Sequence, residues 1–150
     1  MTKITKKDIY YLFDELWPAM LYANQHKNNC LNQFDAISKY FDKYSKEEDH
    51  NKLLKGLCSL EGIAITIGTG LIWSTNRNTR VPFDKYTATY ASKLGLLLTD
   101  KVSTNYIKYS EKIVKYCKDF EIEGRNYEIE DFVREAMHEM EDSEFYIELK

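Results

Sequence analysis

The sequence of 150 residues has no hydrophobic run long enough to cross a membrane. Its longest stretch of apolar and small residues, Gly62 to Trp73, has 12 residues, whereas a membrane-spanning helix needs about 20. The first residues, MTKITKKDIYY, carry charge without a following apolar run, so we expect no secretory signal peptide. These features predict a cytoplasmic protein that does not use a membrane as its partner.

Cysteine is scarce and gives no framework for disulfides or zinc. The three cysteines, Cys30, Cys58 and Cys117, are odd in number and share no short spacing. His26 with Cys30 and Glu135 with His138 have the spacing of paired metal ligands, but further ligands are missing around each pair. We therefore expect neither a metal nor a cofactor.

Charge is divided unequally along the chain. Residues 1–118 hold 18 Lys and Arg against 12 Asp and Glu, while residues 119–150 hold 3 against 12. A mildly basic body permits contact with phosphates, and an acidic segment weakens that contact unless it points elsewhere. The composition thus allows a nucleic-acid partner without requiring one.

Helical periodicity runs through almost the whole chain. Thr5 and Asp8 have the spacing of a capping box at the start of a helix that Pro18 should bend or interrupt, and Ser45 with Glu48 suggests a second box. Apolar residues recur at intervals of three and four in the segments 9–21, 31–41, 53–60, 106–117 and 129–140. The pattern predicts an all-α fold, one compact domain over residues 1–150 with six to eight helices.

Residues 62–73 are ambiguous between a strand and a helix. The alternation of Ile63, Ile65 and Ile67 suits a strand, but the rest of the chain offers no second strand to pair with it. We therefore predict a buried helix, in which small residues at Ala64, Gly68 and Gly70 let neighbouring elements approach closely.

Asp84 stands between a Val-Pro-Phe approach and a helix that runs toward Gly95. A carboxylate at this position is most simply a helix cap, which binds unpaired amide groups of the first turn. The alternative is that Asp84 lies at the mouth of a cleft and acts on a substrate. The two roles are compatible.

The stretch from Leu53 to Leu97 resembles the core of the helix-hairpin-helix DNA glycosylase superfamily. The similarity consists of a helix, a hairpin at residues 60–64 (LEGIA), a second helix of small and apolar residues, the connection STNRNTR, and VPFD before a helix ending in Leu-Gly. Gly62 and Asp84 are 22 positions apart, a separation similar to that of the family. The match covers 45 of the 150 residues.

This resemblance implies a double-stranded DNA partner and assigns roles to residues. The hairpin around Gly62, Ile63, Ala64 and Thr66 would bind a phosphate through backbone amides. A base extruded from the duplex would enter a pocket where Asp84 stabilises charge on the sugar or activates a water. The aromatic residues that could stack on such a base are Trp73, Tyr86, Tyr90 and Tyr106.

Differences from the family restrict the chemistry. Bifunctional members carry a lysine nucleophile shortly after the hairpin, where this chain has Thr66, so a lyase step through a Schiff base is not expected. Ala64 replaces a hairpin glycine, Glu61 adds a negative charge, and the four-cysteine iron–sulfur loop of some members is missing. If the protein is an enzyme, we expect a monofunctional N-glycosylase; a catalytically silent relative is also consistent with these differences.

Two classes of function therefore stay open. The first is a DNA-directed protein, either a glycosylase that uses Asp84 or a module that only binds duplexes. The second is a helical interaction module, in which the hairpin only packs and the acidic C-terminal segment, predicted to be helical over residues 119–150, binds a protein partner. Salt-dependent duplex binding distinguishes the first class from the second.

Overall fold

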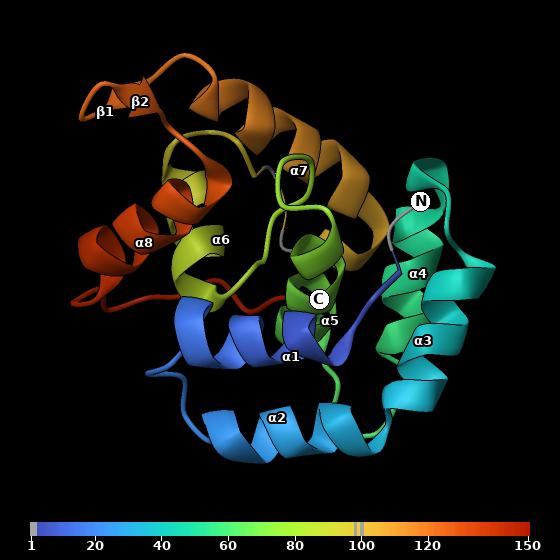
Figure 1. Cartoon of the computed structure of the whole chain (residues 1–150). Helices are drawn as coiled ribbons and strands as arrows, with labels where there is room; N and C mark the ends of the chain where they lie inside the picture. The colour runs from blue at the N-terminus through green and yellow to red at the C-terminus, as the bar shows by residue number, and fades with distance from the viewer. Residues whose placement is uncertain (1–2, 98, 100) are drawn as a thin grey trace.

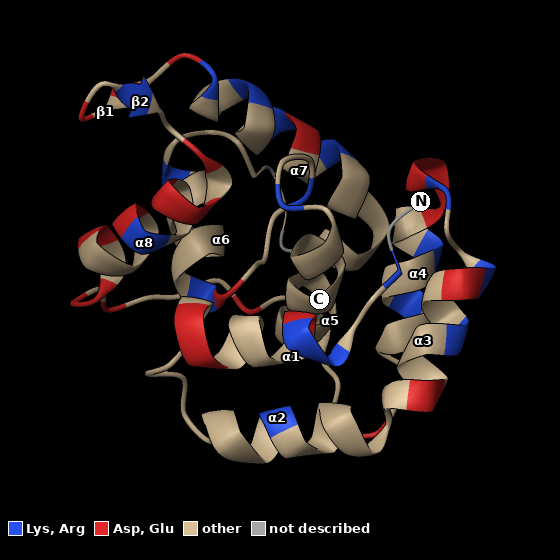
Figure 2. Cartoon of the chain, in the orientation of Figure 1, with Lys and Arg blue, Asp and Glu red and all other residues tan. Residues whose placement is uncertain are grey.

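Helix α5 (Ile65–Thr75) lies at the centre of the molecule, and Figure 2 shows that it carries no charged residue. Helices α1 and α4 pack against it, and the remaining elements surround it (Figure 1). The computed structural model describes residues 3–97, 99 and 101–150. These residues contain eight α-helices and one two-stranded sheet, which confirms the predicted all-α fold in a single compact domain.

The elements follow one another with short connections. The helices are α1 (Lys6–Tyr11), α2 (Ala23–Asn32), α3 (Phe34–Lys43), α4 (His50–Leu57), α5, α6 (Lys85–Lys93), α7 (Val102–Cys117) and α8 (Ile129–Met140). A π-helical turn, η1 (Leu12–Leu16), extends α1, and a 3-10 turn, η2 (Glu47–Asp49), precedes α4. The predicted buried helix over residues 62–73 is thus confirmed, although it begins three residues later and ends two residues later.

The first helix has the predicted capping box and ends before Pro18. The Thr5 side chain accepts from the Asp8 amide, and the Asp8 side chain accepts from the Thr5 amide. The π-helical turn closes with a bond of 2.9 Å from the Trp17 amide to the Leu12 carbonyl, after which Trp17 leaves helical geometry. Proline disfavours helical backbone in the preceding residue, which explains the break at Trp17. The second predicted box is wrong, because Ser45 and Glu48 do not cap η2 or α4.

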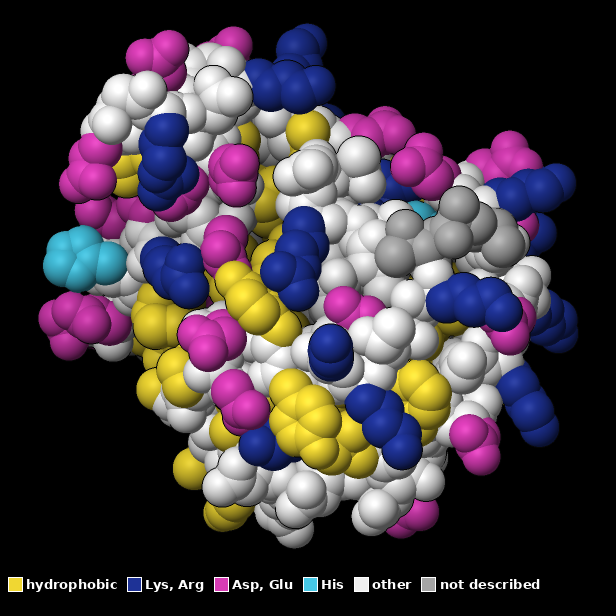
Figure 3. All heavy atoms as spheres, viewed as in Figure 1, with side chains coloured by type: hydrophobic (Ala, Val, Ile, Leu, Met, Phe, Trp, Pro, Cys, Tyr) yellow, Lys and Arg dark blue, Asp and Glu magenta, His cyan; other side chains and the backbone are white. Residues whose placement is uncertain are grey.

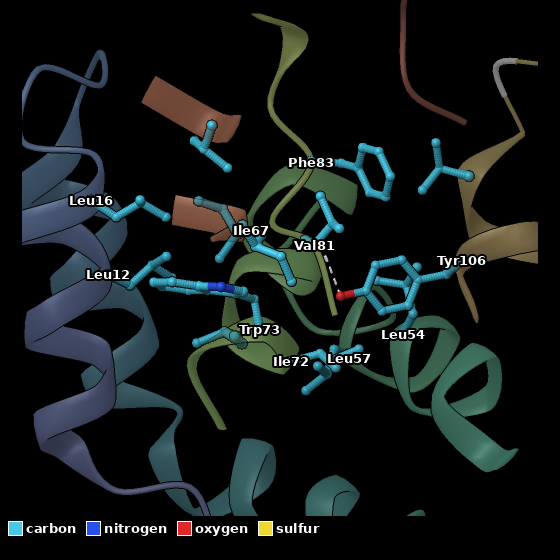
Figure 4. Close-up of a cluster of buried hydrophobic side chains, with 14 of the residues drawn as sticks. Leu12, Leu16, Leu54, Leu57, Ile67, Ile72, Trp73, Val81, Phe83 and Tyr106 are labelled. Carbon is cyan, nitrogen blue, oxygen red and sulfur yellow. Dashed lines mark hydrogen bonds between the residues drawn. The ribbon is translucent and has the colours of Figure 1, made fainter. Parts of the chain in front are cut away.

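Two glycines of α5 have a packing reason for their presence. A Cβ atom at Gly68 would stand 2.8 Å from the Leu54 side chain of α4, and one at Gly70 would stand 2.7 Å from the Trp17 ring. The close approach predicted for Gly68 and Gly70 is therefore confirmed, whereas Ala64 is exposed at the start of the helix. Figure 4 shows the resulting core, with Trp73, Ile72 and Ile67 of α5 beside Leu12, Leu54 and Leu57.

The acidic C-terminal segment differs from its prediction, because only α8 is helical. Strands β1 (Glu121–Ile122) and β2 (Arg125–Asn126) form an antiparallel hairpin, whose turn residues Glu123 and Gly124 both have positive φ, at 49° and 77°. That geometry matches the twist of paired strands and favours glycine. Beyond α8, residues 143–150 form an extended tail that returns across the molecule toward α5 (Figure 1).

Candidate functional site at Asp84

The extended segment Arg80–Asp84 is buried along its whole length and sets the position of Asp84. Its backbone groups bind side chains of α5 and α7 instead of another strand. The Phe83 amide donates to Thr69 Oγ1 at 2.9 Å, the Val81 amide donates to Ser110 Oγ at 3.3 Å, and the Tyr106 hydroxyl donates to the Val81 carbonyl at 2.9 Å (Figure 4). Because buried backbone groups need partners, these bonds hold the approach to Asp84 in one conformation.

Asp84 is the N-cap of α6 and is 7% exposed. Its Oδ1 accepts from the Thr87 amide at 2.6 Å, and its Oδ2 accepts from the indole Nε1 of Trp17 at 3.0 Å. No Lys or Arg side chain within the described part of the chain forms an ion pair with it. Burial raises the pKa of Asp84 above its ordinary value, and the hydrogen bonds from Thr87 and Trp17 oppose that rise.

The carboxylate lies in the wall of a pocket of about 380 Å³, which we call the Asp84 pocket. Its principal lining residues are Trp17, Met20, Thr66, Asp84, Tyr86 and Met137. The structure thus brings together three residues singled out in the sequence, Asp84, Thr66 and Tyr86. Asp84 therefore caps α6, as predicted, and also lies beside a cavity.

Sequence reasoning missed the contribution of Trp17, Ala19, Met20 and Leu21 to this pocket. Helical periodicity included Met20 and Leu21 in the apolar pattern of residues 9–21, but both lie beyond the helical turn that ends at Leu16 and line the Asp84 pocket, and Leu21 is 74% exposed. Tyr22, which is 65% exposed, has a positive φ of 59° and precedes α2. Pro18 was the available signal, since a chain that leaves the helix at a proline no longer follows the helical pattern.

The turn between α4 and α5 has the backbone geometry expected of Gly62, whose φ is +74°. The carbonyl of Glu61 accepts from Asn29 Nδ2 at 2.9 Å and from Gln33 Nε2 at 2.8 Å, which attaches the turn to the end of α2. Ile63 is buried, and its amide donates to the Leu60 carbonyl at 3.2 Å. Ala64 is the N-cap of α5, and no side chain caps that helix end among the described residues.

Two of the aromatic residues proposed to stack on a base are core residues instead. Trp73 is 1% exposed and Tyr106 is fully buried, so neither ring has a face free for a base. Tyr90 is half-buried but binds Glu135 of α8 at 3.2 Å, and it does not line the Asp84 pocket. Of the four candidates only Tyr86 lines the Asp84 pocket. Nothing in the sequence marks the other three as unsuitable, because helical spacing alone does not distinguish an aromatic residue in the core from one at the rim of a pocket.

The C-terminal tail lies against both the pocket rim and the start of α5. The Tyr146 ring contacts the Tyr86 ring edge-on with centroids 5.4 Å apart, and Lys85 Nζ lies 4.6 Å from the Tyr146 centroid. The Ile147 amide donates to Thr89 Oγ1 at 3.0 Å. Glu148 and its neighbours line a small cavity with residues 64–66. The tail therefore places the Glu148 carboxylate beside the helix end where a phosphate was expected to bind.

No set of three or more His, Cys, Asp or Glu side chains that could hold a metal ion occurs within residues 3–97, 99 and 101–150. None of the described helices is long and apolar enough to cross a membrane. Comparisons with models of known protein families, with curated protein sequences and with solved structures found no match for this chain.

Proposed function

We propose that this protein binds double-stranded DNA and accepts an extruded base in the Asp84 pocket, as a monofunctional helix-hairpin-helix glycosylase does. The observation that carries the proposal is the position of one carboxylate. Asp84 is buried, has no cationic partner among the described residues, and faces a cavity whose rim includes Thr66 of α5 and Tyr86 of α6. Burying a carboxylate without a counterion lowers the stability of the folded protein. Such carboxylates are commonly found at active sites, where the chemistry requires them.

The chemistry assigned to Asp84 is electrostatic. As the bond between a base and its sugar breaks, positive charge develops on the sugar, and a nearby ionised carboxylate stabilises that charge more strongly in a site shielded from water. Water then adds to the sugar, its proton passes to the carboxylate or the departing base, and the base leaves. Thr66 offers no amine where bifunctional members carry their lysine, so no strand cleavage through a Schiff base is expected from that position.

The turn at Gly62 is assigned the phosphate contact. Backbone amides at the uncapped start of α5 are suited to an anion, because they have no intrahelical partner and lie at the positive end of the helix dipole. On the face seen in Figure 3, Lys and Arg side chains are interspersed with Asp and Glu instead of forming one basic surface. We therefore expect weak, salt-dependent binding with little sequence preference.

Leu21 is assigned the role of a wedge. It is 74% exposed on the loop that lines the Asp84 pocket, so its side chain is free to enter a duplex that approaches the pocket. Proteins that open a duplex often insert an apolar side chain between base steps, which compensates for the lost stacking. Substitution of Leu21 by Ala should weaken binding to a duplex with an abasic-site analogue more than binding to an intact duplex.

The first experiment measures duplex binding by fluorescence anisotropy between about 50 and 200 mM salt. It compares Gly62→Ala with Gly124→Ala. Both glycines have positive φ, 74° and 77°, so both substitutions impose similar backbone strain, but Gly124 lies in the β-hairpin. A Cβ at Gly62 would also stand 2.6 Å from Asn29 Nδ2, whereas one at Gly124 meets no atom within 4 Å, so the folding of both variants is measured beside their binding. Loss of binding in Gly62→Ala alone supports a phosphate site at the turn. Absence of duplex binding by the unmodified protein at low salt contradicts the proposal.

The second experiment tests catalysis separately. Duplexes that carry alkylated, oxidised or deaminated bases are incubated with the protein, and abasic products are revealed by alkaline strand cleavage. Asp84→Asn should bind these duplexes as the unmodified protein does but release no base. Binding without release by either protein restricts the function to duplex recognition, and unchanged release by Asp84→Asn refutes the role given to the carboxylate.

The second candidate function is a protein-interaction module. The observation that favours it is the acidic balance of residues 119–150, with 3 basic and 12 acidic residues, on elements that pack against α6 and α7. A basic partner bound by this segment is compatible with a complete lack of DNA affinity. Co-migration with a basic peptide in the absence of duplex binding would support this candidate.

A further inference from the structure

A second pocket, of about 560 Å³, lies between the end of α7, the β-hairpin and α8. We call it the aromatic pocket and define it by Tyr116, Phe120, Tyr127, Asp131, Arg134 and Glu135. It shares no lining residue with the Asp84 pocket. The two pockets are therefore separate sites, and a ligand of the aromatic pocket does not depend on the function proposed for Asp84.

Aromatic rings follow one another around this pocket. The Phe120 ring centroid lies 4.8 Å from that of Tyr116 and 6.1 Å from that of Tyr127. On the inner side, the buried Phe132 ring lies 5.8 Å from Tyr116 and 5.4 Å from Tyr90. Successive tilted and edge-on contacts of this kind are favourable and hold the rings in defined orientations.

Glu135 closes the ring of aromatic side chains. Its Oε2 accepts a hydrogen bond from the Tyr127 hydroxyl, and its Oε1 accepts one of 3.2 Å from the Tyr90 hydroxyl. The two tyrosines thus hold the carboxylate at the pocket wall. Burial and the adjacent Glu135 carboxylate raise the pKa of Tyr90 to about 12, so its hydroxyl stays a donor at neutral pH.

The acidic residues of the pocket differ in how their charge is balanced. Asp131 forms a bidentate ion pair with Arg125, at 2.7 and 2.8 Å, and Arg134 lies 3.6 Å from Glu130 of the same helix. Glu135 has no Lys or Arg partner among the described residues. Glu121, which also lines the pocket, has no such partner among the described residues either, so these two carboxylates carry the charge that a ligand would neutralise.

We propose that the aromatic pocket binds an alkylated ammonium group, such as a trimethylated lysine side chain or a choline-type molecule. Faces of aromatic rings attract cations, and an adjacent carboxylate adds direct electrostatic attraction. An unmodified lysine requires acceptors for three N–H groups, whereas Glu135 already accepts from two hydroxyls. An alkylated cation needs aromatic rings and negative charge instead of hydrogen-bond acceptors, and the lining of this pocket supplies three rings beside the carboxylates of Glu135 and Glu121.

The test is an NMR titration of the protein's aromatic resonances. Choline is compared with 3,3-dimethylbutan-1-ol, which has the same shape but carries carbon in place of the charged nitrogen. Choline, up to roughly tens of millimolar, should shift resonances of Tyr116, Phe120 and Tyr127, while the neutral alcohol should not. Equal shifts with both compounds, or none with choline, overturn the proposal.

Variants locate the binding site and separate the attraction of the cation to the aromatic rings from its attraction to the carboxylate. Phe120→Ala removes a ring that is 45% exposed, and Glu135→Gln removes the charge while keeping one acceptor oxygen, with an NH2 donor in place of the other. Each should weaken choline binding by about tenfold. The matched controls are Phe145→Ala, a ring that is 82% exposed in the tail, and Glu139→Gln on α8. Equal losses in the controls contradict the assignment.

A third arm distinguishes the source of the ammonium group. A short peptide with a trimethylated lysine is compared with the same peptide carrying unmodified lysine and with choline. Tighter binding of the trimethylated peptide than of choline identifies a protein partner. Equal binding of the two identifies a small molecule, and preference for unmodified lysine overturns the proposal.

Discussion

The indole of Trp17 donates a hydrogen bond of 3.0 Å to Asp84, although the two residues are 67 positions apart. Trp17 ends the π-helical turn and Asp84 begins α6, so one bond joins two walls of the same pocket. Removing the donor leaves a buried carboxylate with one partner fewer. The position and the ionisation of Asp84 therefore both depend on Trp17.

Replacing Trp17 by Phe should destabilise the protein more than replacing Trp73 by Phe. Both indoles are buried, at 2% and 1% exposure, but Nε1 of Trp73 has no hydrogen-bond partner among the described residues. Since leaving a buried polar group with one hydrogen bond fewer costs about 1 to 3 kcal/mol, the two variants should differ by about that amount in free energy of unfolding. Urea unfolding at neutral pH measures the difference, and equal losses would show that the bond contributes nothing.

Asp84→Asn should change how stability depends on pH. Because the folded pKa of Asp84 is raised, the stability contributed by its protonated form is complete below 3.8, the ordinary value in the unfolded chain, and is lost as pH rises through the folded value. Asparagine does not titrate, so the variant lacks this pH-dependent loss of stability. The unfolding free energy of the unmodified protein, minus that of the variant, should therefore fall as pH rises from about 4 toward neutrality. A difference that increases with pH would mean that the pKa is lowered.

His50 gives a pH dependence of opposite sign. Nε of Arg80 donates to its Nδ1 at 2.7 Å, and burial together with the Arg80 charge lowers the pKa of His50 from 6.5 to about 4. The stability contributed by the neutral imidazole is complete above pH 6.5 and is lost as pH falls through about 4. Relative to His50→Gln, which retains an acceptor for Arg80, the unmodified protein should lose about 2 to 4 kcal/mol across this range. Parallel pH curves for the two proteins would refute this prediction.

Gly70→Ala should destabilise the protein even though alanine favours helices. The new Cβ would lie 2.7 and 2.9 Å from two atoms of the rigid Trp17 ring, so the ring must move. Overpacking of this kind typically costs about 1 to 3 kcal/mol, which exceeds the gain of about 1 kcal/mol in helix propensity. Gly68→Ala is the matched comparison, because its Cβ meets the movable end of Leu54. We expect Gly70→Ala to have the lower melting temperature of the two.

Local patterns in the sequence were sufficient to predict the elements around Asp84. The cap at Asp84, the box at Thr5 and Asp8, and the helix after Gly62 depend on residues only a few positions apart. The short β-hairpin was missed because each strand has two residues. Its one clear signal is Gly124 in a two-residue turn, since glycine adopts the positive φ that such a turn requires.

The composition of the pocket could not be predicted in the same way. Trp17 and Met137 reach the Asp84 pocket from opposite ends of the chain, and nothing in their local sequence indicates that they meet there. The same limit applies to Trp73, which was expected at a binding surface and lies in the core. The position of an aromatic residue in the repeat of an apolar helix is compatible with the core and with a binding surface. Only the packing of neighbouring helices decides between these two locations.

Removing residues 143–150 should strengthen duplex binding if the α4–α5 turn is the DNA site. The tail places Glu148 beside residues 64–66 and holds Lys85 over the Tyr146 ring, so its removal exposes the start of α5 and releases a cation. Losing an acidic segment near bound phosphates should raise affinity most at low salt, where electrostatic terms are least screened.

The truncation also removes apolar contacts of Ile147 and Leu149 with the core, so its stability must be measured beside its affinity. The substitution Glu148→Gln keeps those contacts and changes only the charge beside the turn. A parallel increase in affinity for Glu148→Gln and for the truncated protein would attribute the masking to charge. If the truncated protein remains folded and binds duplexes no better than the full chain, the tail does not restrict access. A binding role for residues 119–150 would then have to lie at another surface, such as the aromatic pocket, most of whose lining residues belong to this segment.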